Sequence, residues 1–283
     1  MIILQDIYKK WNSFTFGPMD IDIQPGLIYA VVGSNGSGKT TLFNLIMNLI
    51  KPDDGEIQLF NQTYPDHEVH IKQKIGYVPY SFLGNPTWTV NQVVQFTSHW
   101  YPTWNQTLCD SLFEQMGINR NIAIGKLSSG TQKKCLLSLA LSIEPSLLLL
   151  DEPTNGLDFT TKQLVIEKCN QWMETGERSI LLATHDLHEV QKVADYLILL
   201  DQGQHLGTFE KDQLLQDWAH IWLDPSTESD IELETITYHS DTKYIITHQR
   251  EKAVKQLQSA GIQIRKIKSM SLEEIIPYLV QQQ

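Results

Sequence analysis

The sequence predicts an α/β domain built on a mainly parallel β-sheet. The main observation is a set of short, nearly all-apolar segments that read LIYAVVG, SLLLLDE, SILLATH and YLILLDQG. Strands with continuous apolar sequences are typical of a parallel sheet that is buried on both faces. Helix-like stretches separate these segments along the chain, among them TTLFNLIMNLI and TTKQLVIEKCNQWMETG. This alternation of strand and helix is typical of layered α/β domains.

Two regions depart from that alternation. Residues 1–26 alternate polar and apolar side chains between turn signals, which predicts an antiparallel β edge. Between residues 80 and 145 the strand pattern fades, and residues 89–118 read as helices. We therefore expect a helical subdomain inserted into the α/β domain.

The composition changes again after residue 210. The segments that follow read IELETIT, KYIITH, REKAVKQLQSAGI, IRKIKS and SLEEIIPYLV. They suggest a small α/β appendage without recognisable chemistry. We therefore expect two domains, residues 1–210 with the helical insertion at 80–145, and residues 211–283 as an accessory domain.

The charge and the cysteines exclude several classes of protein. The net charge is −11 and no Lys/Arg-rich run offsets it, which argues against a nucleic-acid partner. Cys109, Cys135 and Cys169 are widely spaced and form no C-x-x-C pair, so a reducing cytoplasm fits better than a disulfide framework. The N-terminus lacks the apolar stretch of a signal peptide, and every apolar run is too short to span a bilayer. A function at the membrane would therefore need another chain.

A phosphate-binding loop is predicted at GSNGSGKT, residues 33–40, which fits the pattern G-x-x-x-x-G-K-[ST] between a strand and a helix. Its backbone N–H groups and the helix N-terminus can converge on phosphate oxygens. Lys39 is expected to reach the β- and γ-phosphates, and the hydroxyl of Thr40 to bind Mg²⁺. The alternative is a glycine-rich turn with a chance lysine. The residues expected to bind nucleotide here are Gly33, Ser34, Asn35, Gly36, Ser37, Gly38, Lys39, Thr40 and Thr41.

An acidic pair, Asp151 and Glu152, ends the apolar segment LLLLDEP. Ligands bind at the carboxyl ends of parallel strands, so both carboxylates are expected near the phosphate-binding loop. Asp151 is placed to hold Mg²⁺, and Glu152 to polarise an attacking water, which is worth roughly 10²–10⁴ in rate. The alternative is a simple cap of the following helix.

Together these motifs resemble those of the ATP-binding cassette (ABC) ATPases, which power ABC transporters. The chain also contains LSSGTQKK at 127–134, NGLD at 155–158 and ATHD at 183–186, in the family's order across residues 1–210. The resemblance implies a P-loop NTPase core that binds ATP and Mg²⁺ and hydrolyses ATP. It implies that Lys39, Glu152 and His185 are the catalytic residues, with His185 contacting the γ-phosphate.

The stretch LSSGTQKK contains no nucleophile or base, yet the resemblance gives it a role. In the family this motif acts on a nucleotide that is held by a second copy of the domain. Its residues here are Ser128, Ser129, Gly130 and Thr131. Because Ser128 stands where a helix begins, its hydroxyl, the Gly130 N–H and the helix dipole can face an anion. The alternative is an ordinary capped helix.

Two more residues are assigned by the resemblance. Asp158 corresponds to the family's aspartate at the dimer seam, with a solvated turn carboxylate as the alternative. Trp11 stands 22 residues before Gly33 and matches the aromatic residue that stacks on adenine. A plain edge aromatic is the alternative for Trp11.

The chain departs from the family's pattern at three positions. Tyr80 follows Pro79 where the family usually has a glutamine that touches Mg²⁺ or the attacking water. A phenol is longer and stiffer than an amide, and one lost polar contact costs about 1–3 kcal/mol. We therefore expect slower turnover. Ser129 and Thr131 replace the more common glycine and glutamine.

The resemblance also implies the partners. It implies an exporter-type ATPase subunit that forms a homodimer, or a heterodimer with a related ATPase, and binds an integral membrane permease encoded as a separate chain. The protein would then lie at the cytoplasmic face of the cell membrane. Trp88, Trp100, Tyr101 and Trp104 either contact that permease or form the core of the helical subdomain. A weakly hydrolysing regulatory module and a soluble non-transport ABC ATPase remain alternatives.

Overall fold

The computed structural model describes residues 1–174, 176–224, 236–239 and 244–281, the third range for its backbone alone. Most of the segment IELETIT, residues 231–237, and Lys243 therefore lie outside the described residues. The chain divides into two units, Met1–Thr208 and Phe209–Gln283, which are described in turn.

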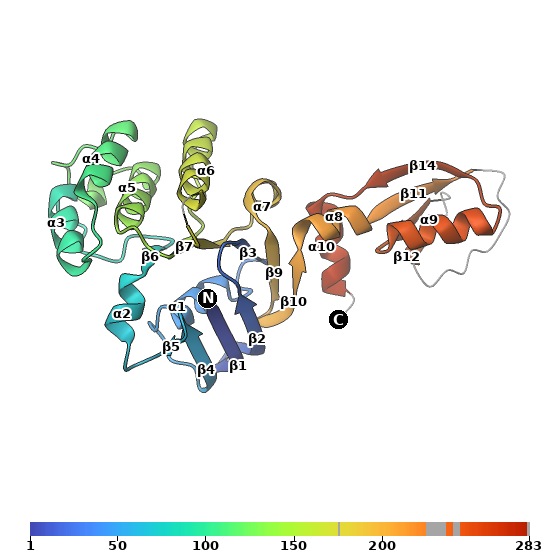
Figure 1. The fold of residues 1–283 in the computed structure, drawn as a ribbon, viewed down its shortest axis with the longest axis horizontal. Coiled ribbons are helices and arrows are strands. Elements are labelled where there is room, and N and C mark those ends of the chain that lie inside the picture. The colour runs from blue at the N-terminus through green and yellow to red at the C-terminus, as the bar shows by residue number, and fades with distance from the viewer. Residues whose placement is uncertain (175, 225–235, 240–243, 282–283) are drawn as a thin grey trace. The chain divides into compact units, whose positions relative to one another are not determined.

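A six-stranded sheet with the order β10-β9-β3-β8-β7-β6 forms the centre of the first unit (Figure 1). Its strands are β3 (Ile28–Val32), β6 (Ile75–Val78), β7 (Leu147–Asp151), β8 (Ser179–Ala183), β9 (Tyr196–Asp201) and β10 (Gln204–Glu210). Strand β3 pairs in parallel with β8 and β9, and β7 pairs in parallel with β6 and β8. Every residue of β3, β7 and β8 is buried. The predicted α/β class with a mainly parallel sheet is therefore confirmed.

A second, antiparallel sheet contains the N-terminal residues. Its order is β2-β1-β4-β5, with β1 (Ile2–Lys10), β2 (Thr15–Ile23), β4 (Asp54–Leu59) and β5 (Gln62–Thr63). From Phe16 onward β2 largely alternates buried and exposed residues, as a sheet with one solvated face requires. Helix α1 (Lys39–Ile46) joins both sheets in one core, in which Leu42 and Phe43 pack with residues of β1 and β7. A short helix, α2 (Glu68–Gln73), leads into β6.

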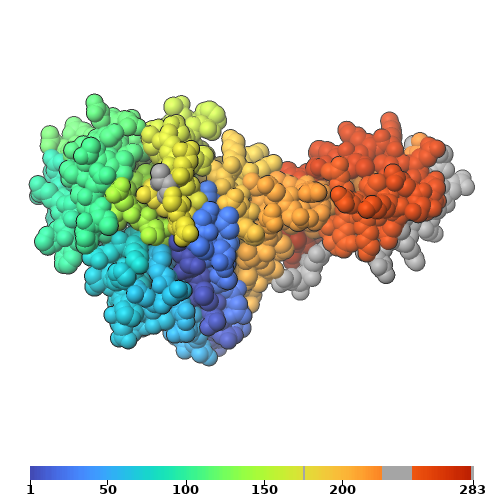
Figure 2. All heavy atoms as spheres, in the orientation of Figure 1, coloured from blue at the N-terminus to red at the C-terminus, as the bar shows by residue number. Residues whose placement is uncertain are grey.

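The other face of the parallel sheet is covered by helices. These are α3 (Val90–Trp100), α4 (Gln106–Gln115), the 3₁₀ turn η1 (Ile124–Lys126), α5 (Ser129–Ser142), α6 (Phe159–Met173) and α7 (Leu187–Val193). Leu147 and Leu149 of β7 point into the core around α1, whereas Leu148 and Leu150 point into the core beneath the helices. This follows from the two-residue period of a strand. Helices α3 to α5 lie between β6 and β7 in the chain and gather at one end of the first unit, coloured green in Figure 2.

The aromatic residues of these helices divide into two groups. Trp88 and Trp104 pack against the hydrophobic core, whereas Trp100 is 58% exposed. The exposed side chain of Phe96 makes edge contacts with the rings of both Trp88 and Trp100. Part of the cluster is thus core, and Phe96 and Trp100 present an apolar surface.

The second unit is a small α/β layer built on an antiparallel sheet of order β12-β13-β11-β14. Its elements are α8 (Lys211–Asp217), β11 (Ala219–Leu223), β12 (Ile236–His239), β13 (Tyr244–Thr247), α9 (Arg250–Ser259), β14 (Ile264–Ser269) and α10 (Leu272–Gln281). Ala253 and Leu257 of α9 pack on Ile221 and Ile245 of the sheet. Among the described residues, no helix combines the length and apolar composition that a bilayer crossing needs.

Candidate active site

The loop between β3 and α1 folds closely around the side chain of Lys39. The ammonium group donates hydrogen bonds to the carbonyl oxygens of Gly33 at 2.8 Å and Ser34 at 3.1 Å. Burial lowers the pKa of Lys39, and the carboxylates of Glu152 and Asp151 oppose that shift. Gly38 has φ of +108°, and a Cβ there would meet the ring of Phe16 at 2.7 Å. The glycine therefore permits a turn that another residue would strain.

Thr40 and Asp151 form the second part of the site. Thr40 Oγ1 donates a hydrogen bond to Asp151 Oδ2 at 3.1 Å, although 111 residues separate them in sequence. Asp151 is buried at the end of β7, and burial raises the pKa of its carboxyl while the Thr40 hydrogen bond lowers it. A hydroxyl and a carboxylate oxygen side by side suit Mg²⁺, a hard cation that prefers oxygen ligands. The described residues contain no cluster of three His, Cys, Asp or Glu side chains that could hold a metal. A magnesium ion here would take its remaining ligands from phosphate and water.

Glu152 and His185 form the third part. Both carboxylate oxygens of Glu152 lie near His185 Nδ1, at 2.9 and 2.8 Å. The two residues meet because Asp151 and Ala183 are partners in neighbouring parallel strands, and each side chain follows the carboxyl end of its strand. Glu152 is 7% exposed and adopts a φ of +50°, whereas His185 is exposed. The pair thus combines a buried carboxylate with an accessible imidazole.

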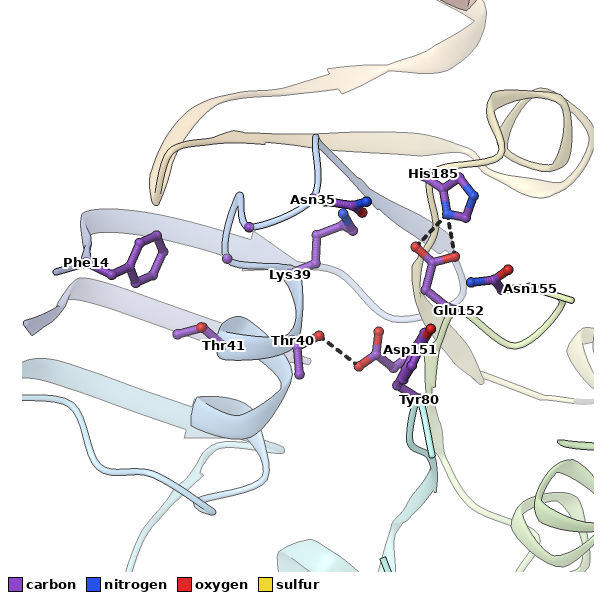
Figure 3. A pocket seen from close by; sticks show the side chains of 12 residues that line it. Phe14, Asn35, Lys39, Thr40, Thr41, Tyr80, Asp151, Glu152, Asn155 and His185 are labelled. Atoms are coloured by element: carbon purple, nitrogen blue, oxygen red, sulfur yellow. Dashed lines mark hydrogen bonds and ion pairs between the residues drawn. The ribbon is translucent and has the colours of Figure 1, made fainter. Parts of the chain in front are cut away.

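These three parts line one cavity of about 680 Å³. Figure 3 shows Glu152 turned toward His185 and Thr40 toward Asp151, with Phe14 on the other side of Lys39. The lining residues are Phe14, Asn35, Gly36, Gly38, Lys39, Thr40, Thr41, Tyr80, Asp151, Glu152, Asn155 and His185. Ten of them were predicted as site residues from the sequence. Gly33, Ser34 and Ser37 belong to the same loop but do not line the cavity.

Two lining residues were missed. Asn155 lies inside the NGLD motif, so the sequence contained its signal, but no role was assigned to it. Phe14 lies three residues after Trp11, and only the turn between β1 and β2 brings its ring to the cavity. Trp11 itself does not line the cavity; its ring centroid is 6.0 Å from that of Phe14. Trp11 thus lies next to Phe14, at the end of the cavity that the Phe14 ring lines.

The remaining predicted residues lie outside the cavity, at two helix N-termini. Ser128 is the N-cap of α5, where its Oγ accepts a hydrogen bond from the Thr131 N–H at 3.2 Å and lies 2.9 Å from Thr131 Oγ1. Ser128 and Ser129 are exposed, and Gly130 is half-buried beside Leu157. Asp158 is the N-cap of α6 and accepts hydrogen bonds from the Thr161 N–H and hydroxyl. Within one chain, these residues cap their own helices.

Comparison with known proteins gives a consistent family assignment. Residues 16–155 match the family model described as "ABC transporter". A relative named "Nod factor export ATP-binding protein I" from Burkholderia orbicola (strain AU 1054) is 30% identical over 212 residues, which cover 73% of this chain and 69% of the relative. The "ABC transporter ATP-binding protein YtrB" of Bacillus subtilis (strain 168) is 29% identical over 203 residues, covering 72% and 69% of the two chains.

Solved structures agree on the fold. A dimeric, post-hydrolysis structure of the ATP-binding cassette MJ0796 bound to ADP and Pi superposes with a TM-score of 0.66 and 23% identity, covering 74% of this chain and 98% of that one. A structure titled "Structure of ATP binding subunit of ABC transporter" has a TM-score of 0.70 and 21% identity, and covers 76% of this chain and 92% of that chain.

Proposed function

Because the chain belongs to the ABC transporter family of ATP-binding proteins, we propose that it is the ATP-hydrolysing subunit of a transporter and dimerises around two Mg²⁺-bound ATP molecules to drive a separate membrane permease. The observation that supports this best is the convergence of Lys39, Thr40, Asp151, Glu152 and His185 on one cavity. They come from three separate stretches of the sequence, and each has the chemistry that one part of phosphoryl transfer requires.

Each residue has a role in this proposal. The loop N–H groups and the Lys39 ammonium bind the phosphates, and Thr40 and Asp151 hold Mg²⁺. The metal, when bound, neutralises the charge of the phosphate oxygens. Glu152 orients and polarises the attacking water. His185 hydrogen-bonds to Glu152, and its exposed ring is available to the γ-phosphate.

The dimer is proposed because five of the predicted site residues lie at two helix N-termini, outside the cavity of their own chain. Ser128 and Ser129 are exposed at the N-terminus of α5, which attracts anions, and Asp158 is exposed at the N-terminus of α6. A pair moves from 1% to 99% closed when ligands supply about 5.5 kcal/mol of differential binding. Two ATP molecules share that requirement, and a few charge-assisted hydrogen bonds of about 1.5–3 kcal/mol each meet it. The dimeric neighbour bound to ADP and Pi has the same fold.

Export and membrane location are the finer parts of the proposal. A relative of 30% identity is named for Nod factor export, which favours an exporter-type subunit. The exposed side chains of Phe96 and Trp100 on α3 offer an apolar surface for a permease. The protein would then be peripheral, at the cytoplasmic face of the cell membrane, as a homodimer or as a heterodimer with a related ATPase.

The test of the dimer uses the Glu152→Gln variant, which is expected to bind ATP without hydrolysing it. Adding Mg²⁺ and ATP should convert this variant from monomer to dimer, as measured by light scattering during gel filtration. The matched control adds Lys39→Ala to the same variant and should stay monomeric, because the phosphate contact is lost. If Glu152→Gln stays monomeric at saturating ATP, the shared-nucleotide mechanism is wrong.

A second candidate function is a weakly hydrolysing regulatory module. Tyr80 favours it, since this tyrosine lines the cavity at the position where the family usually has glutamine. Steady-state ATP turnover of the purified protein with its co-purified membrane partner separates the two candidates. Sustained turnover supports the transporter subunit, whereas tight Mg²⁺–ATP binding without turnover supports the regulatory module.

A further inference from the structure

Lys133 is a buried cation that no motif assigns to the site. It lies on α5, within LSSGTQKK, and is 8% exposed. Its ammonium donates hydrogen bonds to two backbone carbonyl oxygens of the loop after β7, those of Glu152 at 2.5 Å and Asn155 at 2.8 Å. A single side chain of the helical region thus holds both ends of the loop that carries the acidic pair.

The surroundings of Lys133 compensate for the burial of its charge. Burial lowers the pKa of the ammonium group, and the nearby carboxylates of Glu152 and Asp151 oppose that shift. The ring of Tyr80 lies over the ammonium, 5.6 Å from Nζ to the ring centroid. An aromatic face attracts a cation. The tyrosine that replaces the family's glutamine therefore has a partner in this chain.

The backbone of Glu152 needs such support. Its φ of +50° lies in the left-handed region, which a residue with a side chain adopts only when its neighbours hold it there. The Glu152 N–H donates to the Ala183 carbonyl at 2.8 Å, and the Glu152 carbonyl accepts from Lys133 Nζ and, at 3.3 Å, from the Asn155 N–H. Among the contacts on that carbonyl, the bond from Lys133 is the charged and the shorter one. It therefore restrains the backbone from which the Glu152 carboxylate projects.

We propose that Lys133 is a positioning residue for ATP hydrolysis. It holds the Glu152 backbone in the left-handed turn that aims the carboxylate at His185 and the reacting phosphate, and Tyr80 covers its ammonium group. The inference rests on the proposed function, since it assigns a role within that reaction. Lys133 touches neither nucleotide nor metal in this role; it acts through Glu152.

The test compares three variants in steady-state ATP hydrolysis. Lys133→Met keeps an apolar stem of similar length and removes the hydrogen-bond donors. Because the misaimed Glu152 no longer orients water, kcat should fall about 10- to 100-fold, while the KM for ATP stays within about threefold, since the phosphate-binding loop is unchanged. Lys133→Arg can donate to both carbonyls and should restore most of the lost kcat.

The matched control is Lys134→Met, on the same turn of α5. Lys134 donates to the Met116 carbonyl at 3.0 Å, away from the acidic pair, so its loss should leave kcat within about threefold. If Lys133→Met leaves kcat unchanged, or if kcat and ATP affinity fall together in both methionine variants, Lys133 does not position Glu152. If Lys133→Met does not fold, Lys133→Arg decides alone: a kcat near that of the wild type supports the proposal, and a kcat as low as that of Glu152→Gln overturns it. Absence of turnover in the wild type would instead count against the proposed function.

Discussion

The cavity and two exposed helix N-termini contain residues of the family's motifs, but their contacts differ in kind. These helix tips are the start of α5 at Ser128 and the start of α6 at Asp158. In the cavity, Thr40 meets Asp151 and Glu152 meets His185 across large separations in sequence. At the tips, the side chains of Ser128 and Asp158 accept hydrogen bonds from Thr131 and Thr161, three positions further along their own helices. Long-range contacts of the first kind arise only from the fold, whereas local caps form in any helix that begins with such a residue.

This difference shows what one chain can and cannot complete. The cavity brings together a cation, two carboxylates, a hydroxyl and an imidazole, which is a full set for phosphoryl transfer. The tips present the side chains of Ser128, Ser129 and Asp158 to solvent, and none of these three residues lines the cavity. Under the proposed function, the tips gain a ligand only when a second protomer brings one.

The largest expected effect tests the cavity. Replacing Glu152 by Gln should lower kcat by about 10²–10⁴, because the amide cannot act as a base. ATP should still bind, since Lys39 and the loop are intact. Hydrolysis is measured by phosphate release and binding by titration calorimetry.

The control for that variant is Glu114→Gln, an exposed carboxylate on α4. Its kcat should equal that of the wild type. If Glu152→Gln retained more than about a tenth of the wild-type rate, the assignment of Glu152 as the catalytic base would be wrong.

The cavity was largely predictable from the sequence because its chemistry lies at strand ends. The parallel strands are apolar throughout, so SLLLLDE and SILLATH show where each strand stops and which polar residues follow. Lys133 was not predictable in this way. A lysine near the start of a helix reads as solvent-exposed, and its burial depends on a loop that follows β7 and folds back over it.

Ser128→Ala tests the helix tip and should have the next largest effect. Losing the N-cap costs about 0.5–2 kcal/mol in the free energy of unfolding. Losing a charge-assisted bond to the partner's nucleotide, worth about 1.5–3 kcal/mol, should weaken ATP-driven dimerisation about 10- to 150-fold for each of the two nucleotides that the dimer encloses. Dimerisation is followed by sedimentation in the Glu152→Gln background.

Thr89→Ala is the matched control, because Thr89 is the N-cap of α3 and forms a capping box with Gln92. It should cost a similar amount of stability and leave dimerisation intact. Equal dimerisation of the two alanine variants would mean that Ser128 only caps its helix and does not bind the partner's nucleotide.

The aromatic end of the cavity has a smaller expected effect. Stacking of a base on an aromatic side chain is worth about 1–3 kcal/mol by alanine substitution. We therefore expect Phe14→Ala or Trp11→Ala to weaken the binding free energy of ATP by about that amount, without changing kcat at saturating ATP. Calorimetry with ATP and with inorganic triphosphate separates the base from the phosphates, because only ATP binding should weaken. The residue with the larger loss is the stacking partner, and no loss in either variant would exclude both.

The position of Phe14 shows a limit of sequence interpretation. The family resemblance and the distance along the chain from the phosphate-binding loop predict Trp11 as the stacking residue, yet Phe14 is the residue that lines the cavity. The turn between β1 and β2 decides this, and a turn's conformation depends on backbone angles and packing rather than on spacing. Helix caps such as Ser128 and Asp158 lie at the opposite extreme, because their position follows from local sequence alone.

The smallest effect concerns Asp158 as the charged cap of α6, and it is tested by the pH dependence of stability. Hydrogen bonds from the Thr161 hydroxyl and N–H hold the pKa of this exposed carboxyl below its usual value. The unfolded chain therefore binds the proton more readily, and the ionised cap stabilises the fold at pH values above the usual pKa of an aspartate. That contribution is lost as the pH falls through the lower pKa of the folded state. Asp158→Ala should thus lower the melting temperature slightly at pH 7, and the difference from the wild type should vanish in acid. A difference that persists there would show that packing, and not the charged cap, stabilises the start of α6.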